Sequence, residues 1–280
     1  MILTMPHTLY IAQRLQATLA EVGIKSVLSD NDRIAKNFNI IFAIALQNFP
    51  AVPENNCIAF QVEQSVFPYR WPPEYLQRLA KCRAVLEYSQ QNIKPLQKHV
   101  AKEKIIYVPL SPGPIMKSGI PRRQPILFYG DISFTRRNEI LAKIRASIPE
   151  LEIETNLFGP DMANRLHNTK IVLNIHAWKG GLLETARISE ALAHGCIVVS
   201  ETSVDQAQYR DFQDRILYVP EGDSKALVTT LRKLLDDPAE LHHRQKSLNK
   251  PHPDHFRMHI LHVIKQLRMI TSQTEVIRGI

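Results

Sequence analysis

The stretch LLETARISEALAHGCIVVSE, residues 182–201, decides how this chain folds. Its first half predicts a short amphipathic helix in which Glu184, Arg187 and Glu190 recur three residues apart and therefore lie near one face. Gly195 predicts the end of that helix. The β-branched run CIVVS that follows is typical of a strand buried on both faces of a parallel sheet. A helix leading directly into such a strand indicates an α/β layer, in which ligands bind at the carboxyl ends of the strands.

Apolar strands and amphipathic helices alternate through both halves of the chain. The first half contains the runs ILTM, IKSVLS, NIIFAIAL, CIAFQV, AVLEYS and IIYVPL, and the second contains ILFYG, LEIETNLFG, IVLNIHA, CIVVSE and ILYVP. Short runs separated by helical or loop segments predict parallel βα units. Between the halves, residues 111–125 contain four prolines and two glycines, which exclude a continuous helix or strand. We therefore predict an α/β fold with an N-terminal domain (1–112), a linker (113–124), a second domain (125–250) and a C-terminal helix (251–280).

A family resemblance covers about residues 126–238. EALAHGCIVVSE (190–201) resembles the segment Glu-Ala-(Leu/Met)-Ala-x-Gly-x-(Pro/Val)-Val-Val of GT-B glycosyltransferases of the group 1 type. FYGDISFTRR (128–137) resembles their opening strand and phosphate loop, LFG (157–159) their second strand, and IVLNIHAW (171–178) the strand before their donor loop. In this family the glutamate at the position of Glu190 holds the ribose of a nucleotide-sugar donor.

The resemblance implies two Rossmann-like domains that face each other across a cleft, with the last helix crossing back onto the N-terminal domain. It implies a metal-independent, cofactor-free transfer of a sugar from a nucleotide-sugar donor to a glycan, lipid or other acceptor, as in polysaccharide biosynthesis. Many retaining members carry a second glutamate eight residues before the ribose-binding one, where this chain has Leu182. Glu184 is the candidate to replace it. A retaining and an inverting reaction both remain open, as does a catalytically silent protein that only binds nucleotide or glycan.

The departing diphosphate gains negative charge and therefore needs fixed positive groups. Gly130 permits close backbone approach after its strand, and Arg136 and Arg137 open the next helix, where free amide groups also favour anions. The absence of a GK(S/T) ending excludes a Walker loop. The alternative is that the two arginines are solvated residues at a helix start. Gly159, which ends LFG, is a further predicted donor-binding residue.

The run after IVLN supplies further candidates. His176 is predicted to lie at the carboxyl end of its strand, where it either contacts the donor or is a buried core group. Lys179, Gly180 and Gly181 form a basic loop that either donates backbone N–H groups to an anion or is a plain turn. Arg187 either binds phosphate or pairs with a glutamate of its own helix.

The N-terminal half should supply the acceptor site and, for an inverting reaction, a base. Glu63 ends the predicted strand IAFQVE, where a carboxylate is costly unless it has a partner or a use, and Glu63 and the adjacent Gln64 are our candidates. His7, after the first strand, is either a further candidate or an exposed loop residue.

Two patterns with metal-binding spacing have simpler interpretations. The run SDND at residues 29–32 matches an Asp-x-Asp metal site but also makes a strong turn sequence. His255, His259 and His262 have zinc-capable spacing, yet they border the apolar stripe of a predicted helix. We therefore predict no metal site.

Composition agrees with a two-domain globular protein. The 280 residues are 44% hydrophobic, and no apolar run or leader predicts a membrane span or signal peptide, so we expect a cytoplasmic protein. The three cysteines form no CxxC pair and are predicted to be buried thiols. The net charge of +8 indicates anionic partners: a nucleotide diphosphate, a lipid phosphate acceptor, or the anionic inner face of a membrane. Nucleic acid is the weaker alternative, because there is no Lys/Arg tract and aromatic residues make up only 7%.

Overall fold

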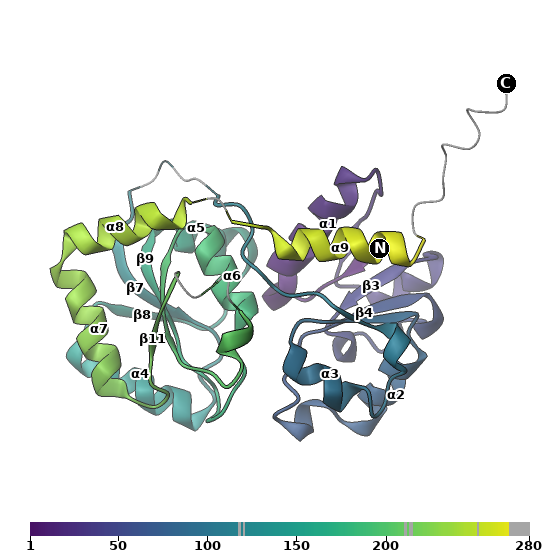
Figure 1. The fold of residues 1–280 in the computed structure, drawn as a ribbon, viewed down its shortest axis with the longest axis horizontal. Helices are drawn as coiled ribbons and strands as arrows, with labels where there is room; N and C mark the ends of the chain where they lie inside the picture. Colours follow the sequence, from purple (N-terminus) through teal and green to yellow (C-terminus); the bar gives the residue numbers. More distant parts are fainter. Residues whose placement is uncertain (117–118, 120, 210–211, 213–214, 251, 269–280) are drawn as a thin grey trace. The chain divides into compact units, whose positions relative to one another are not determined.

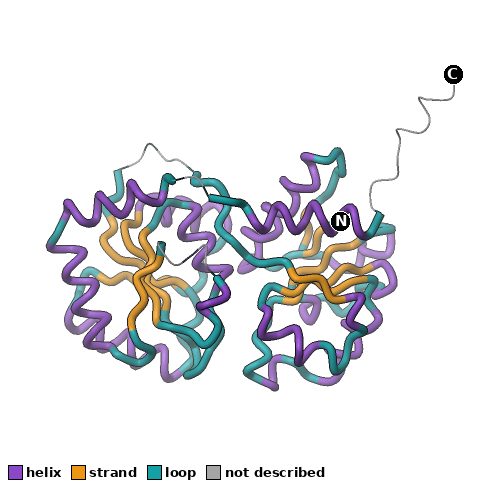
Figure 2. Tube along the Cα trace, viewed as in Figure 1, coloured by secondary structure: helices purple, strands orange, loops and turns teal. Residues whose placement is uncertain are grey.

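The computed structural model describes residues 1–116, 119, 121–209, 212, 215–250 and 252–268 (Figure 1). The chain divides into two compact units. Unit 1 consists of Met1–Glu63, Trp71–Pro109 and the residues from His255 onward, and unit 2 consists of Gln64–Arg70 and Leu110–Asp254. Each unit contains one parallel sheet with helices packed on it (Figure 2). This confirms the predicted α/β fold with two Rossmann-like domains.

Unit 1 has a six-stranded sheet in the order β2-β1-β3-β4-β5-β6. The strands are β1 (Ile2–Leu3), β2 (Leu28–Ser29), β3 (Ile41–Ile44), β4 (Cys57–Gln61), β5 (Ala84–Glu87) and β6 (Ile105–Tyr107). The helices are α1 (Leu9–Glu21), α2 (Pro73–Lys81), α3 (Gln90–Leu96) and α9 (His255–Gln266). Although α9 is far from α1 in sequence, the two helices lie side by side (Figure 1).

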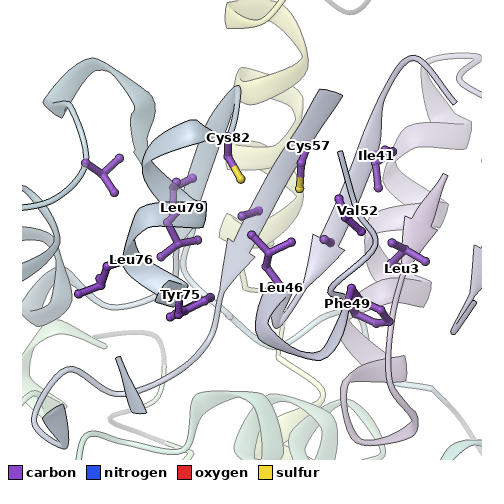
Figure 3. Close-up of a cluster of buried hydrophobic side chains, with 14 of the residues drawn as sticks. Leu3, Ile41, Leu46, Phe49, Val52, Cys57, Tyr75, Leu76, Leu79 and Cys82 are labelled. Atoms are coloured by element: carbon purple, nitrogen blue, oxygen red, sulfur yellow. The ribbon is translucent and has the colours of Figure 1, made fainter. Parts of the chain in front are cut away.

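Alternate residues of β4 enter different sides of the core of unit 1. Cys57 and Ala59 belong to a cluster that also contains Tyr75 and Leu79 of α2 (Figure 3). On β4, Phe60 instead stacks on Phe256 of α9, with ring centroids 6.1 Å apart. This alternation follows from the two-residue period of a strand, and it requires a strand that is apolar on both faces.

Unit 2 has a five-stranded sheet in the order β11-β10-β9-β7-β8. The strands are β7 (Gln124–Tyr129), β8 (Leu151–Glu154), β9 (Thr169–Asn174), β10 (Ile197–Glu201) and β11 (Ile216–Val219). The helices are α4 (Thr135–Ser147), α5 (Gly159–Asn168), α6 (Thr185–Ala193), α7 (Ser224–Asp236) and α8 (Pro238–Leu248). On β7, Ile126 and Phe128 face the cluster of α4 and α7, whereas Leu127 and Tyr129 face that of α5 and α6. Because the strands are parallel, the polar residues that end β7, β9 and β10 lie at one edge of the sheet.

Two local predictions differ from the structure. The LFG segment is not a strand: β8 ends at Glu154, and Gly159 is the first residue of α5, with φ of +60°. The helix predicted from Leu182 begins only at Thr185, because side chains elsewhere in the chain bind the backbone of Leu182 and Leu183. It ends where expected, since Gly195 adopts φ of +73°.

Candidate functional site

The functional candidates of unit 2 gather at the carboxyl ends of β7, β9 and β10. Tyr129, Asn174 and Glu201 are the last residues of these strands, and α6 brings Arg187 and Glu190 to the same edge. Sequence reasoning missed Tyr129, Asn174 and Glu201. Their signal was present, because each is a polar residue that closes an apolar strand.

Glu190 is half-buried on α6, beneath the end of β7. The Tyr129 hydroxyl donates to its Oε2 at 3.2 Å and is also 2.9 Å from the Arg187 carbonyl oxygen. Burial raises the pKa of Glu190 to about 7, because it outweighs the hydrogen bond from Tyr129 and the charge of Arg187. The carboxyl group can therefore gain or lose a proton near neutral pH.

Arg187 lies over the turn that follows β7. Its Nη1 donates to Asn174 Oδ1 at 2.7 Å, and its guanidinium lies 5.4 Å from the centroid of the Phe128 ring. A Cβ atom at Gly130 would lie 2.5 Å from Arg187 Nη2 and would displace the guanidinium, and the φ of +139° at this position itself favours glycine. Arg187 forms no ion pair with any carboxylate in the described part of the chain. Its positive charge remains available to a ligand.

Arg136, in contrast, is already paired. Its two terminal nitrogens donate to Glu201 at 3.0 and 2.6 Å, and Nη1 also donates to the His176 carbonyl at 2.8 Å. Glu201 is fully buried and accepts two further bonds, from the backbone N–H groups of His176 and Gly222. This bidentate pair ties the start of α4 to the end of β10.

Arg137 is paired as well and is only 4% exposed. Its guanidinium donates to the carbonyls of Ile175 at 2.9 Å and Asp131 at 2.7 Å, and it lies 3.3 Å from Glu184 Oε1. Burial and then the charge of Arg187 lower the pKa of Arg137 to about 10. Its side chain thus holds the loops after β7 and β9 together.

His176 and Glu184 form a buried pair. Nδ1 of His176 lies 2.6 Å from Glu184 Oε2, and Nε2 lies 3.2 Å from the Thr202 carbonyl. Because both ring nitrogens face acceptors, the arrangement favours the imidazolium. Burial opposes that charge, but the Glu184 carboxylate outweighs it and raises the pKa of His176. Burial also acts against the ionised carboxylate of Glu184, yet His176, Arg187 and Arg137 together lower its pKa to about 2.

Residues 178–183, which we call the donor loop, lie between His176 and Glu184 in the sequence. Gly180 has φ of +73° and donates its N–H to Glu221 at 2.7 Å. Leu183 donates its N–H to Asp205 at 2.9 Å. The Lys179 side chain is exposed, and neither its ammonium group nor the Gly181 N–H has a hydrogen-bond partner among the residues that the structure describes.

A pocket of about 350 Å³ opens between the donor loop and the start of α4. Its lining combines hydroxyl groups, aromatic rings and cations: Ser133, Phe134, Thr135, Arg136, Ala177, Trp178 and Lys179. A site with this composition can hold a polar ligand that carries negative charge. Gly159, at the start of α5, is not among the lining residues.

The candidates of the N-terminal half lie in unit 1. Glu63 follows β4, and its Oε1 accepts from Gln47 Nε2 at 2.9 Å. His7 is exposed in a short 3-10 helix, Pro6–Thr8.

Side chains from both metal-like patterns make other contacts. Asp32 accepts from the Ala51 N–H at 2.7 Å and thus serves a turn, and His259 lies 2.8 Å from the Tyr107 carbonyl. Within the described residues, no group of three potential ligands comes together to hold a metal ion.

Comparisons with known proteins give a family match for the second half of the chain. Residues 125–262 match the model of a family described as glycosyl transferase-like. WaaG, a glycosyltransferase involved in lipopolysaccharide biosynthesis, superposes with a TM-score of 0.58 at 13% identity, covering 97% of this chain and 98% of that one. HepE from Anabaena, solved with UDP and glucose, superposes with a TM-score of 0.60 at 11% identity, covering 91% and 89%.

Other similar structures are longer. A TarM variant from S. aureus, solved with fondaparinux, alpha-GlcNAc-glycerol and UDP, has a TM-score of 0.58 at 9% identity and covers 84% of this chain. This chain spans only 57% of that TarM chain. A search of curated proteins finds no match. At these identities, the likeness to solved structures establishes the fold.

Proposed function

We propose that this chain, whose residues 125–262 match the glycosyl transferase-like family, is a group 1 glycosyltransferase of the GT-B fold that moves a sugar from a nucleotide-sugar donor to a glycan or lipid-linked acceptor. The observation that carries the proposal is that α6 brings to one sheet edge a half-buried glutamate, Glu190, and an arginine, Arg187, that forms no ion pair with a carboxylate in the described part of the chain. UDP and UDP-glucose, which occupy similar structures, are the first donors to test.

Glu190 would hold the ribose. Two ribose hydroxyls can donate to its carboxylate, and bonds to a charged acceptor are the stronger kind. The ionised form is required, so binding should lower the pKa of Glu190 from its value of about 7 in the free protein. Tyr129, which donates to the same carboxyl group, would keep it oriented.

Arg187 and Lys179 would meet the diphosphate. The sequence predicted that Arg136 or Arg137 binds the diphosphate. In the structure, however, Arg136 forms an ion pair with Glu201 and Arg137 forms one with Glu184. Their charges are therefore balanced before any donor arrives. Arg187 and the N–H groups at the start of α4 can strengthen their contacts as charge develops on the leaving group.

His176 and Glu184 would have a positioning role and would not contact the donor themselves. Their charged groups contact each other and buried polar atoms, and His176 is completely buried. We propose that they hold the donor loop against the sheet and that the transferred sugar lies in the pocket beside Trp178. Glu63 remains our proposed acceptor-side group. The reaction is proposed to need no metal or other cofactor.

Calorimetry and a donor-hydrolysis assay test the proposal. Wild-type protein should bind UDP or GDP and hydrolyse one of their sugars slowly, and Glu190→Ala should remove nucleotide binding while the protein stays folded. Turnover should survive EDTA. Unchanged nucleotide affinity in a folded Glu190→Ala variant would overturn the ribose assignment.

A catalytically silent nucleotide-binding protein is the second candidate. Leu182 stands where the family resemblance calls for a sugar-binding glutamate, and Glu184 is occupied by His176, Asn174 and Arg137. Nucleotide binding without hydrolysis or transfer of any donor sugar would favour this function.

A peripheral contact with an anionic membrane at the cytoplasmic face is also our proposal. The chain carries a net charge of +8, and α9 exposes Lys265 together with Met258, which is 54% exposed. No helix in the described residues is long and apolar enough to cross a membrane. Co-sedimentation with vesicles that contain phosphatidylglycerol, compared with phosphatidylcholine alone, tests this contact.

A further inference from the structure

A short segment from the N-terminal half packs with unit 2. Gln64–Arg70, which we call the strap, belongs to unit 2, although its neighbours Glu63 and Trp71 belong to unit 1. The strap lies against the donor loop through one amide side chain and several aromatic rings.

The amide is that of Gln64. Its Oε1 accepts from the Leu182 N–H at 2.8 Å, and its Nε2 donates to the Leu182 carbonyl at 3.2 Å. Leu182 is fully buried, so both of its backbone groups would lose their partners without this side chain. One carboxamide thus takes the place of a neighbouring strand and fixes the backbone of the donor loop at one residue.

The rings surround Trp178, which opens the donor loop. The Phe67 ring centroid lies 4.1 Å from that of Trp178, and the Tyr69 ring meets it edge-on at 5.6 Å. Phe134, from the turn before α4, approaches to 4.4 Å. Because Trp178 and Phe134 line the pocket, the strap supports one of its walls.

We propose that the strap positions the donor loop for glycosyl transfer and that Gln64 is a positioning residue. Its catalytic consequence rests on the function proposed above. Glu190 and Arg187 make no hydrogen bond to the strap in the described residues, so nucleotide affinity should not depend on it. The pocket wall does depend on it, and so should the placement of the sugar.

The holding of the loop can be tested without any donor. The chain has two tryptophans, and the buried indole N–H of Trp71 has no hydrogen-bond partner in the structure, so Trp71→Phe leaves Trp178 as the sole reporter. In that background, Gln64→Ala should raise acrylamide quenching of Trp178 about twofold, because the loop opens locally. Gln16→Ala is the matched control, since its amide donates to a loop carbonyl of unit 1, that of Ser26, at 3.0 Å. Equal quenching in Gln64→Ala and the control would overturn the proposal.

The catalytic consequence is tested with UDP, UDP-glucose and GDP-mannose. Gln64→Ala should lower kcat for donor hydrolysis by roughly 10- to 100-fold while the Kd for UDP changes less than about twofold. Gln64→Glu keeps the acceptor for the Leu182 N–H but loses the donor, and should lie between Gln64→Ala and wild type.

The two proposals fail in different ways. Wild-type kcat in Gln64→Ala, or an equal loss of UDP affinity and kcat, would overturn the positioning role. A wild-type protein that binds no nucleotide would overturn the proposed function instead, while the quenching experiment would still decide whether the strap holds the loop.

Discussion

Each sheet has a buried glutamate at its carboxyl edge, but the groups that surround the two glutamates differ in charge. In unit 1, Glu87 ends β5 and is surrounded by neutral donors: Gln61 at 2.9 Å, the Ser89 N–H at 2.9 Å and Asn92 at 2.8 Å. Burial outweighs these bonds and raises the pKa of Glu87 to about 8. In unit 2, Glu184 has cations around it, and its pKa lies at about 2.

The difference teaches where an anion can bind. With a pKa of about 8, Glu87 is mostly neutral at pH 7, and the hydrogen bonds that it accepts from described residues come from neutral groups. The edge in unit 2 carries cations that keep the buried Glu184 ionised, and within the described residues Arg187 and Lys179 form no ion pair with a carboxylate. Among the described residues, the comparison therefore favours unit 2 for the anion site that we propose.

The largest expected effect comes from breaking the buried pair of unit 2. Glu201→Gln removes the buried carboxylate of this pair and leaves Arg136 only Glu221, 3.6 Å away, as an ion-pair partner among the described residues, so we expect a loss of about 3 kcal/mol in unfolding free energy. Urea unfolding followed by Trp178 emission in the Trp71→Phe background measures it. Glu150→Gln, which breaks an exposed pair with Arg232, is the control and should cost about 0–1 kcal/mol. A loss below about 1 kcal/mol for Glu201→Gln would mean that solvent already compensates Arg136.

The next effect concerns the unpaired cation. Arg187→Gln should lower kcat for donor hydrolysis by about 10- to 1000-fold, equivalent to about 1.4–4 kcal/mol, because the lost charge acts most strongly on the developing diphosphate. UMP affinity should change much less, since UMP lacks the second phosphate. Arg232→Gln, on the surface of the same unit, is the matched control. Unchanged turnover in Arg187→Gln would move the diphosphate site elsewhere.

The third effect is a pH dependence of donor binding. Below pH 7 the Glu190 carboxyl group becomes protonated in the free protein, and binding must then release that proton. The affinity for UDP-glucose should fall by up to about tenfold per pH unit below pH 7. This donor suits the measurement because its diphosphate does not titrate in that range. Glu190→Gln should bind weakly at every pH, and a slope that persists in this variant would assign the titration to another group.

The smallest effect lies in unit 1. The pKa of Glu87 is about 8 in the folded state, against 4.5 for an unperturbed glutamate, so the folded state binds the proton more tightly. The resulting stability is complete below pH 4.5 and is lost as the pH rises towards 8. From these two pKa values we expect unit 1 to lose about 2 kcal/mol between pH 6 and pH 8, and Glu87→Gln to lack this slope. Urea unfolding followed by Trp71 emission in a Trp178→Phe variant measures it, and a stability that rises with pH would contradict the assignment.

Local patterns in the sequence were sufficient to predict the fold. The β-branched run before Glu201 and the glycine at position 195 set strand and helix end through short-range physics, and the structure agrees with both. The family resemblance is confirmed by the glycosyl transferase-like match over residues 125–262. The predicted buried, free state of all three cysteines is also confirmed.

The partners of the charged side chains could not be predicted from these local patterns. The position of Arg136 at a helix start was predictable, but its partner Glu201 lies 65 residues away and closes a strand that is otherwise apolar. The bond between Gln64 and Leu182 spans 118 residues and leaves no periodic signal in either segment. Which cations are free is therefore decided by tertiary contacts that the sequence alone does not specify.

The burial of every cysteine has a practical consequence for spectroscopy. Burial raises the pKa of Cys196 to about 12, and Cys57 and Cys82 lie within the core of unit 1. A maleimide reagent should therefore leave the folded wild-type chain unlabelled. Single cysteines introduced at the exposed positions Lys98 in unit 1 and Lys225 in unit 2 would accept spin labels selectively. The distance between such labels, recorded with and without UDP-glucose, would measure whether the donor changes the separation of the two labelled positions.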